Sequence, residues 1–173
     1  MQNLTHSQSP KEALTDYPLW VIWLVRILAL GALGVAIYLT IAHYDTKVSL
    51  LCPDNATINC QEVTTSPQSM IVGIPVAVLG LAYYVIVSVL AWWPRAKATT
   101  TFELIRLIVA LGGVGFILYL VYAEIVEIGA ICLWCTSVHL ITILIFLLLL
   151  YAWMTYRDRL SGGLATAKRD VGI

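Results

Sequence analysis

The segment Gly129-Ala-Ile-Cys132-Leu-Trp-Cys135-Thr-Ser-Val-His139 opens the last long apolar run of a chain of 173 residues. Two cysteines at this spacing place their sulfurs about one turn apart at a helix start. Such pairs commonly have a depressed thiol pKa and exchange disulfides. Zinc sites use the same spacing, so the motif alone leaves redox chemistry and metal binding open.

The composition is that of an integral membrane protein. Hydrophobic residues make up 60% of the chain and charged residues 12%, against roughly 45–50% and 25% in soluble domains. Spans of about 20 residues are needed to cross a bilayer, and four apolar runs qualify: 19–42, 71–93, 102–123 and 131–153. We therefore expect an all-α, four-helix transmembrane bundle at 19–156, between polar tails at 1–18 and 157–173, the second of them disordered. The net charge is zero and no nucleotide-binding motif occurs, so neither a nucleotide site nor a nucleic-acid partner is expected.

The distribution of basic residues predicts the orientation, because Lys and Arg in short loops stay cytoplasmic. They gather at the start of the first run, in the second connection and in the C-terminal tail: Lys11, Arg26, Arg95, Lys97, Arg106, Arg157, Arg159, Lys168 and Arg169. On the other side Lys47 is the only basic residue, beside Asp45, Asp54, Glu62, Glu124 and Glu127. Both termini are thus expected to be cytoplasmic in the inner membrane, with Arg26 reaching the headgroups. All four cysteines then face the oxidising, extracytoplasmic side.

The loop before the second run carries Cys52 and Cys60. Asn59 followed by Glu62 has the form of a helix N-cap with a carboxylate three positions later. We expect a short amphipathic helix from Cys60 to Ser66, stopping before Pro67 and lying over the mouth of the bundle. The positive end of the fourth helix should also favour a thiolate at Cys132.

Two interpretations of the cysteines without redox activity stay open. One is a pair of structural disulfides that staple the outer loops. The other is a four-cysteine zinc site, which we disfavour because a knuckle-like loop and second-shell donors are missing from the sequence. His139 shares a helix face with Cys132 and Cys135. It is either a packing histidine or a hydrogen-bond donor to the carbonyl oxygen of an apolar ligand beside Cys135.

The remaining polar residues in and beside the third run suggest structural roles. Glu103 and Arg106, three positions apart, predict an ion pair in the first turn. The small residues of 112–115 would allow a neighbouring helix to approach closely. Glu124 and Glu127 follow the run and are interpreted as solvated turn residues.

Taken in order, these features resemble the vitamin K epoxide reductase family over about Leu19 to Tyr156. The shared pattern is four spans, two loop cysteines eight positions apart, a serine six residues later, Gly-Ile-Pro opening the second helix, and Cys-x-x-Cys opening the fourth. The bacterial disulfide-bond oxidase DsbB carries its two pairs in the reverse order, which favours the former family. Without a fused thioredoxin-like domain, the chain resembles a compact bacterial homologue that serves a separate partner.

The resemblance implies a role for each matching position. Cys52 and Cys60 match the loop shuttle pair, with Cys52 meeting the partner protein and Cys60 attacking Cys132. Cys132 and Cys135 match the active-site pair, with Cys135 nearest the quinone. Ser66 matches a loop residue that helps to cover the site.

Two positions depart from the animal enzymes and bear on the substrate. A tyrosine and an asparagine that reach the vitamin's oxygens there are replaced here by His139 and Val76, which favours a plain quinone, ubiquinone or menaquinone, over an epoxide. The expected activity is oxidation of a DsbA-like thioredoxin-fold carrier by a membrane quinone, in support of disulfide formation. The alternatives are a vitamin K quinone or epoxide reductase proper, and a non-enzymatic four-span protein with structural disulfides.

Overall fold

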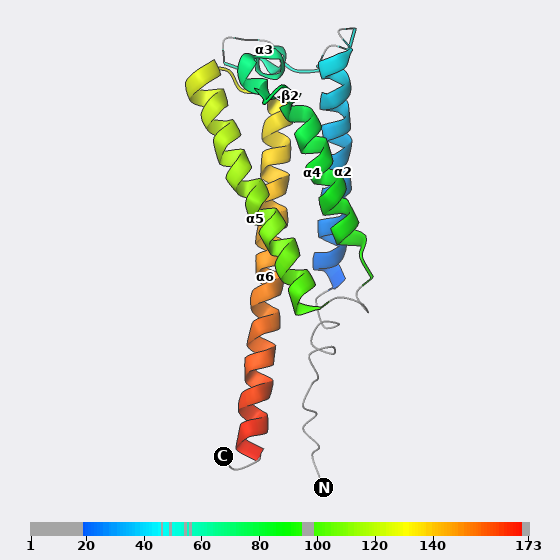
Figure 1. Cartoon of the computed structure of the whole chain (residues 1–173), viewed down its shortest axis with the longest axis vertical. Coiled ribbons are helices and arrows are strands. Elements are labelled where there is room, and N and C mark those ends of the chain that lie inside the picture. Colours follow the sequence, from blue (N-terminus) through cyan, green and yellow to red (C-terminus); the bar gives the residue numbers. More distant parts are fainter. Residues whose placement is uncertain are drawn as a thin grey trace.

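The computed structural model describes residues 19–45, 47–48, 50–53, 55, 57–94 and 99–170, of which 156 and 158–170 are described for the backbone alone. Its long helices are α2 (Leu19–Tyr44), α4 (Val76–Trp92), α5 (Thr100–Tyr122) and α6 (Leu133–Asp170). They run alongside one another in alternating directions (Figure 1). The expected first tail, Lys11, Asp54, Arg95 and Lys97 lie outside the described residues.

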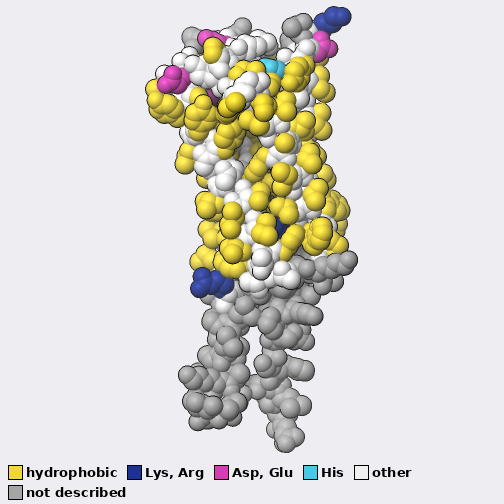
Figure 2. Space-filling model, in the orientation of Figure 1, with side chains coloured by type: hydrophobic (Ala, Val, Ile, Leu, Met, Phe, Trp, Pro, Cys, Tyr) yellow, Lys and Arg dark blue, Asp and Glu magenta, His cyan; other side chains and the backbone are white. Residues whose placement is uncertain are grey.

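Within the described residues, three helical segments are long and apolar enough to cross a membrane. They are Leu19–Tyr44, Thr100–Ile128 and Leu133–Thr155, whereas α4 is apolar but only 17 residues long. Figure 2 shows hydrophobic side chains over the flank of the described part, with most charged side chains on this face at its two ends. Large apolar side chains exposed in this way are what a lipid-facing surface requires. The chain is therefore a membrane protein.

Small residues on α2 explain how the helices pack. Most of the buried positions on α2 alternate in steps of three and four: Ile22, Val25, Ala29, Ala32, Ala36 and Leu39. A repeat of seven residues keeps one stripe of a helix facing its neighbours. The alanines in its middle let backbones approach closely where no hydrophobic effect drives association. This stripe packs against α4 and α6.

A small cap lies over one end of the helices, at the end opposite the start of α2 and the end of α6 (Figure 1). It contains α3 (Cys60–Thr65), the 3-10 turn η1 (Pro67–Ser69), and strands β1 (Met70–Ile71) and β2 (Ile74–Pro75). The Asn59 side chain accepts the backbone N–H of Glu62 at 2.9 Å. The predicted short helix and its N-cap are confirmed.

The predicted start of the second span at residue 71 is wrong. Residues 70–75 form an antiparallel hairpin instead, and the helix begins at Val76. At the turn, Val72 and Gly73 both have positive φ, 49° and 80°, as a two-residue hairpin turn requires. An apolar run of this kind has no periodicity that separates a short strand from the first turn of a helix.

Two other boundaries also differ from the prediction. After α5 the chain continues in a π-helical turn, η3 (Ala123–Ile128), which ends at Gly129 with φ 74°. Helix α6 runs on to Asp170, so the expectation of a disordered tail was wrong for residues 157–170. Most residues there, including Leu164, Ala165 and Lys168, are good helix formers that extend a helix already nucleated upstream.

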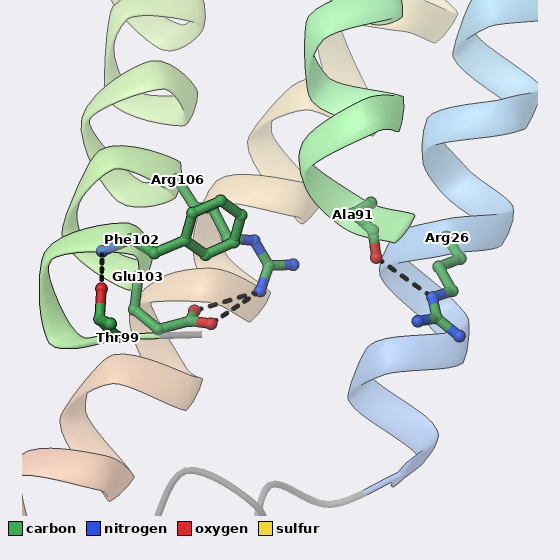
Figure 3. A network of polar contacts seen from close by, with 6 residues as sticks. All are labelled: Arg26, Ala91, Thr99, Phe102, Glu103 and Arg106. Carbon is green, nitrogen blue, oxygen red and sulfur yellow. Dashed lines mark hydrogen bonds and ion pairs between the residues drawn. The ribbon is translucent and has the colours of Figure 1, made fainter. Parts of the chain in front are cut away.

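At the end of the molecule opposite the cap, two arginines are held by protein partners (Figure 3). Arg106 pairs with Glu103 at 3.1 Å, which confirms the predicted ion pair. Arg26 donates to the Ala91 backbone oxygen at 3.1 Å, and its guanidinium lies 4.7 Å from the Trp92 ring centre. It therefore joins α2 to the last turn of α4.

Candidate functional site

The cap and the start of α6 bring all four cysteines together. Cys52 and Cys60 form a disulfide with a Cα–Cα distance of 6.1 Å, while Cys132 and Cys135 are free. Cys60 is 1% exposed and Cys132 is fully buried. They belong to one packed cluster with Val63, which Cys52 and Cys135 border. Two of the sulfurs that the zinc alternative needs as thiolates are thus joined to each other.

A parallel bridge holds the loop pair over the second pair. Ile58 pairs with Ile131; the Ile131 N–H donates to the Thr57 oxygen at 2.9 Å, and the Asn59 N–H to the Ile131 oxygen at 3.2 Å. The bridge lies two residues before Cys60 and one before Cys132, so it fixes these cysteines relative to each other. No local sequence pattern predicts a contact between segments more than 70 positions apart.

A second attachment, which we term the Leu51 clamp, consists of Tyr38, Leu51 and Trp134. The Trp134 Nε1–H donates to the Leu51 oxygen at 3.0 Å, and the Leu51 N–H donates to the Tyr38 hydroxyl at 3.0 Å. The two rings meet edge to face with centres 5.1 Å apart. Trp134 lies inside the Cys-x-x-Cys motif, so the motif itself holds the residue before Cys52.

Cys132 directly precedes α6, and its sulfur accepts the backbone N–H of Cys135 at 3.3 Å. The sulfur therefore occupies the place of an N-cap side chain. The Cys135 thiol, hydrogen-bonded to this sulfur, lowers the pKa of the Cys132 thiol from its usual range, and the Cys135 backbone N–H lowers it further; burial and the Glu124 charge oppose this. These hydrogen bonds favour a thiolate at Cys132.

Below the cap the helices enclose a largely apolar cavity of about 420 Å³. Its wall includes Cys135, His139 and Val76, three of the predicted quinone contacts. Ser66 does not line it; its hydroxyl donates to the Val63 oxygen at 2.9 Å, where α3 turns into η1. Cys132 is also absent from the wall, so Cys135 is the sulfur that faces the cavity. A mostly apolar site with a few polar groups is typical of small-molecule binding.

The polar groups in the wall suit a ligand with carbonyl oxygens. His139 is 6% exposed, and no other described residue hydrogen-bonds its ring. The Tyr83 hydroxyl is buried and likewise has no partner among the described residues. Tyr83 belongs to no motif in the sequence, so it was not among the predicted site residues. Buried donors normally find a partner, so a quinone carbonyl fits these two groups.

The small residues at 112–115 were expected to let a neighbouring helix approach closely. In the structure, close approach occurs at one of these positions only. Only Gly113 among the described glycines meets a close neighbour: a side chain there would overlap the Tyr83 hydroxyl and press on Thr142. The neighbouring Tyr84 hydroxyl donates to the Val138 oxygen at 3.0 Å. Gly113 therefore makes room for the unpartnered tyrosine.

The interpretation of Glu124 as a solvated turn residue is wrong. Glu124 is 6% exposed and lines the cavity. Glu127 is exposed as expected, and the Tyr122 hydroxyl lies 3.4 Å from it. The apolar residues continue from Leu120 to Ile128, so Glu124 is an ionisable residue inside an apolar run. That signal ordinarily marks a functional site.

A model of the vitamin K epoxide reductase family matches residues 23–150. The match spans α2 to the middle of α6 and includes the cap and all four cysteines. No curated protein matches the chain.

Proposed function

Because the chain belongs to the vitamin K epoxide reductase family, and is thus a membrane oxidoreductase that acts on thiols and quinone, we propose that it oxidises a thioredoxin-fold carrier with a membrane quinone. The observation that carries the proposal is the placement of the sulfurs. Cys60 and Cys132 share one buried cluster, and Cys135 faces a cavity with two unpartnered polar groups. In this proposal the helices form a four-span bundle in the inner membrane, with the cap outside and both termini in the cytoplasm.

The proposed electron path begins at Cys52. A reduced DsbA-like carrier attacks the Cys52 sulfur, forming a mixed disulfide and releasing the Cys60 thiolate. After the carrier leaves oxidised, Cys60 attacks Cys132 of the second pair and releases the Cys135 thiolate. Cys52 then attacks Cys60, which restores the loop disulfide and leaves Cys132 and Cys135 reduced. Each step needs an attacking thiolate and an accessible sulfur, and the arrangement of one closed and one open pair corresponds to the end of this sequence.

The quinone, ubiquinone or menaquinone, supplies a two-electron acceptor when bound. The chain's own residues hold it: Cys135 at the reacting face, His139 and Tyr83 as hydrogen-bond donors, and Val76 as an apolar wall. Ser66 acts one step away by ending α3 and so shaping the cover. The donor set lacks the residues expected for an epoxide, so the quinone is the favoured substrate.

Quinone absorbance during turnover tests the activity. Purified protein in detergent receives a dithiol donor and a ubiquinone or naphthoquinone analogue, beside Cys135→Ala. We expect oxidised quinone to disappear with the parent and not with the variant, because Cys135 is the sulfur at the cavity. If neither quinone is consumed by folded parent protein with its loop disulfide intact, the proposal fails and the structural-disulfide alternative stands.

Cys52→Ala is the matched control, since it removes a sulfur at the other end of the path. Turnover with a protein carrier should stop, while a small dithiol that reaches Cys132 and Cys135 should retain part of its rate. Equal loss of both activities would remove the shuttle role from Cys52.

A further inference from the structure

The last exchange step of the proposed electron path has two competing outcomes. Once Cys60 has attacked Cys132, these two sulfurs form a disulfide and the other two cysteines are free. In the forward step Cys52 attacks Cys60 and releases Cys132. In the reverse step Cys135 attacks Cys132, which closes the second pair again and returns the electrons to Cys60. The direction of exchange therefore depends on which thiol reaches the disulfide first.

Regular structure places Cys135 well for the reverse step. It lies in the first turn of α6, and its backbone N–H donates to the Cys132 sulfur at 3.3 Å. Cys52 has no such support, because residues 50–53 form neither a helix nor a strand. Holding a reacting group in place raises its effective concentration at the target. Cys52 therefore needs a restraint of its own to compete.

The Leu51 clamp supplies this restraint. Among the described residues, the only hydrogen bonds to the segment 50–53 are the two of the clamp. They hold the backbone N–H and oxygen of Leu51, the residue before Cys52, while the Leu51 side chain is 81% exposed. The partners belong to long helices, Tyr38 to α2 and Trp134 to α6. The clamp can therefore hold the segment while the loop disulfide is open.

The leaving sulfur also suits the forward step. Attack by the Cys52 thiolate forms the Cys52–Cys60 bond, breaks the Cys60–Cys132 bond and releases Cys132 as a thiolate. The Cys135 N–H that donates to the Cys132 sulfur stabilises this thiolate, and a stabilised thiolate leaves faster. The loop pair is thus oxidised and the second pair reduced, with Cys135 at the cavity.

We propose that the Leu51 clamp sets the direction of thiol exchange; this rests on the proposed function. Tyr38 and Trp134 are positioning residues, which act by holding Cys52 beside the Cys60 sulfur. The loop disulfide then re-forms before the second pair can close again. With the clamp released, the second pair closes first and the two electrons return to Cys60.

A chain with three cysteines, made by Cys135→Ala, tests the clamp without quinone or carrier. With one disulfide and one thiol, Cys60 is linked either to Cys52 or to Cys132, and the two forms interconvert by exchange. The backbone N–H at position 135 is retained. Peptide mapping after acid quenching gives the ratio of the Cys60–Cys132 link to the Cys52–Cys60 link.

Tyr38→Phe in this chain keeps the ring and removes the hydroxyl that accepts the Leu51 N–H. We expect the ratio to rise by up to about five-fold, the equivalent of one hydrogen bond. Trp134→Phe, which removes the other bond, should shift the ratio in the same direction. Tyr44→Phe is the matched control: it makes the same change on the same helix at a residue that is 68% exposed and outside the clamp, and its ratio should be parental.

Turnover of a ubiquinone analogue provides the second readout. With reduced DsbA as the donor, electrons pass through the loop pair, so Tyr38→Phe in the four-cysteine chain should slow turnover by up to about five-fold. With dithiothreitol as the donor and Cys52→Ala as the background, Tyr38→Phe should have no effect, because the clamp then has no cysteine to position. A general loosening of the protein would slow both reactions.

The outcomes separate the two proposals. Parent protein that consumes no quinone with either donor overturns the proposed function and this inference with it. Active parent whose Tyr38→Phe and Trp134→Phe variants keep the parental ratio of the two links overturns the inference alone. An equal shift in Tyr44→Phe, or an equal loss of turnover in the Cys52→Ala background, makes the clamp a structural contact and also overturns the inference.

Discussion

The Leu51 clamp should hold the loop cysteine segment closed, and Trp134→Phe tests it. Phenylalanine keeps a ring against Tyr38 but removes the Nε1–H that donates to the Leu51 oxygen. One such hydrogen bond contributes about 1 kcal/mol net, so local opening should become about five-fold more frequent. Trp134→Ala removes the ring pair as well, worth about 0.5–1.5 kcal/mol more.

Hydrogen exchange of the backbone amides at 50–52 measures this opening directly. The Leu51 N–H, bonded to the Tyr38 hydroxyl, should exchange about five-fold faster in Trp134→Phe. Trp20→Phe is the control, because Trp20 pairs with Tyr151 away from the cap. Unchanged exchange in Trp134→Phe, or an equal rise in Trp20→Phe, would refute the clamp as the restraint on this segment.

Three stability predictions follow from single contacts. Asn59→Ala removes the N-cap of α3 and should destabilise the cap by about 1 kcal/mol, seen as faster hydrogen exchange in 60–65 with α6 unaffected. Gly113→Ala should overlap the Tyr83 hydroxyl and lower thermal stability in detergent, whereas Gly115→Ala, with open space around it, should leave stability unchanged or raise it; similar losses in both would contradict the contact. Ile145→Ala, at a 1% exposed position, should cost about 2 kcal/mol, the low end for such truncations, because apolar groups gain little on leaving lipid; reversible unfolding in detergent measures it.

Local patterns made some elements predictable. The short cap helix follows from Asn59 and Glu62, because an N-cap is a contact between residues three positions apart. The start of α6 near Cys132 and the pair Glu103 and Arg106 are equally local. The long helices could be located from apolar runs, although their ends shifted where hydropathy alone does not distinguish a strand from a helix, as at the hairpin of residues 70–75.

The remaining features could not be predicted because they depend on contacts between segments that are far apart in the sequence. The Ile58–Ile131 bridge, the Leu51 clamp and the unpartnered Tyr83 hydroxyl each result from packing between distant segments. Glu124 is different, because its apolar surroundings could be read from the sequence. It was misplaced because the predicted helix ended at residue 123, whereas a π-helical turn carries the chain one more turn and keeps the carboxyl inside.

The burial of Cys60 and Cys132 also protects these two sulfurs from redox molecules in solution. Of the four sulfurs, these two have almost no surface that a soluble thiol or oxidant could reach. In the proposed electron path, small redox molecules would then be unable to exchange electrons with the two central sulfurs, and electrons could be lost only at Cys52 and at Cys135. The source of the electrons would therefore be determined by the protein that binds at the partly exposed Cys52. The redox potential of the surrounding medium would have only a weak effect.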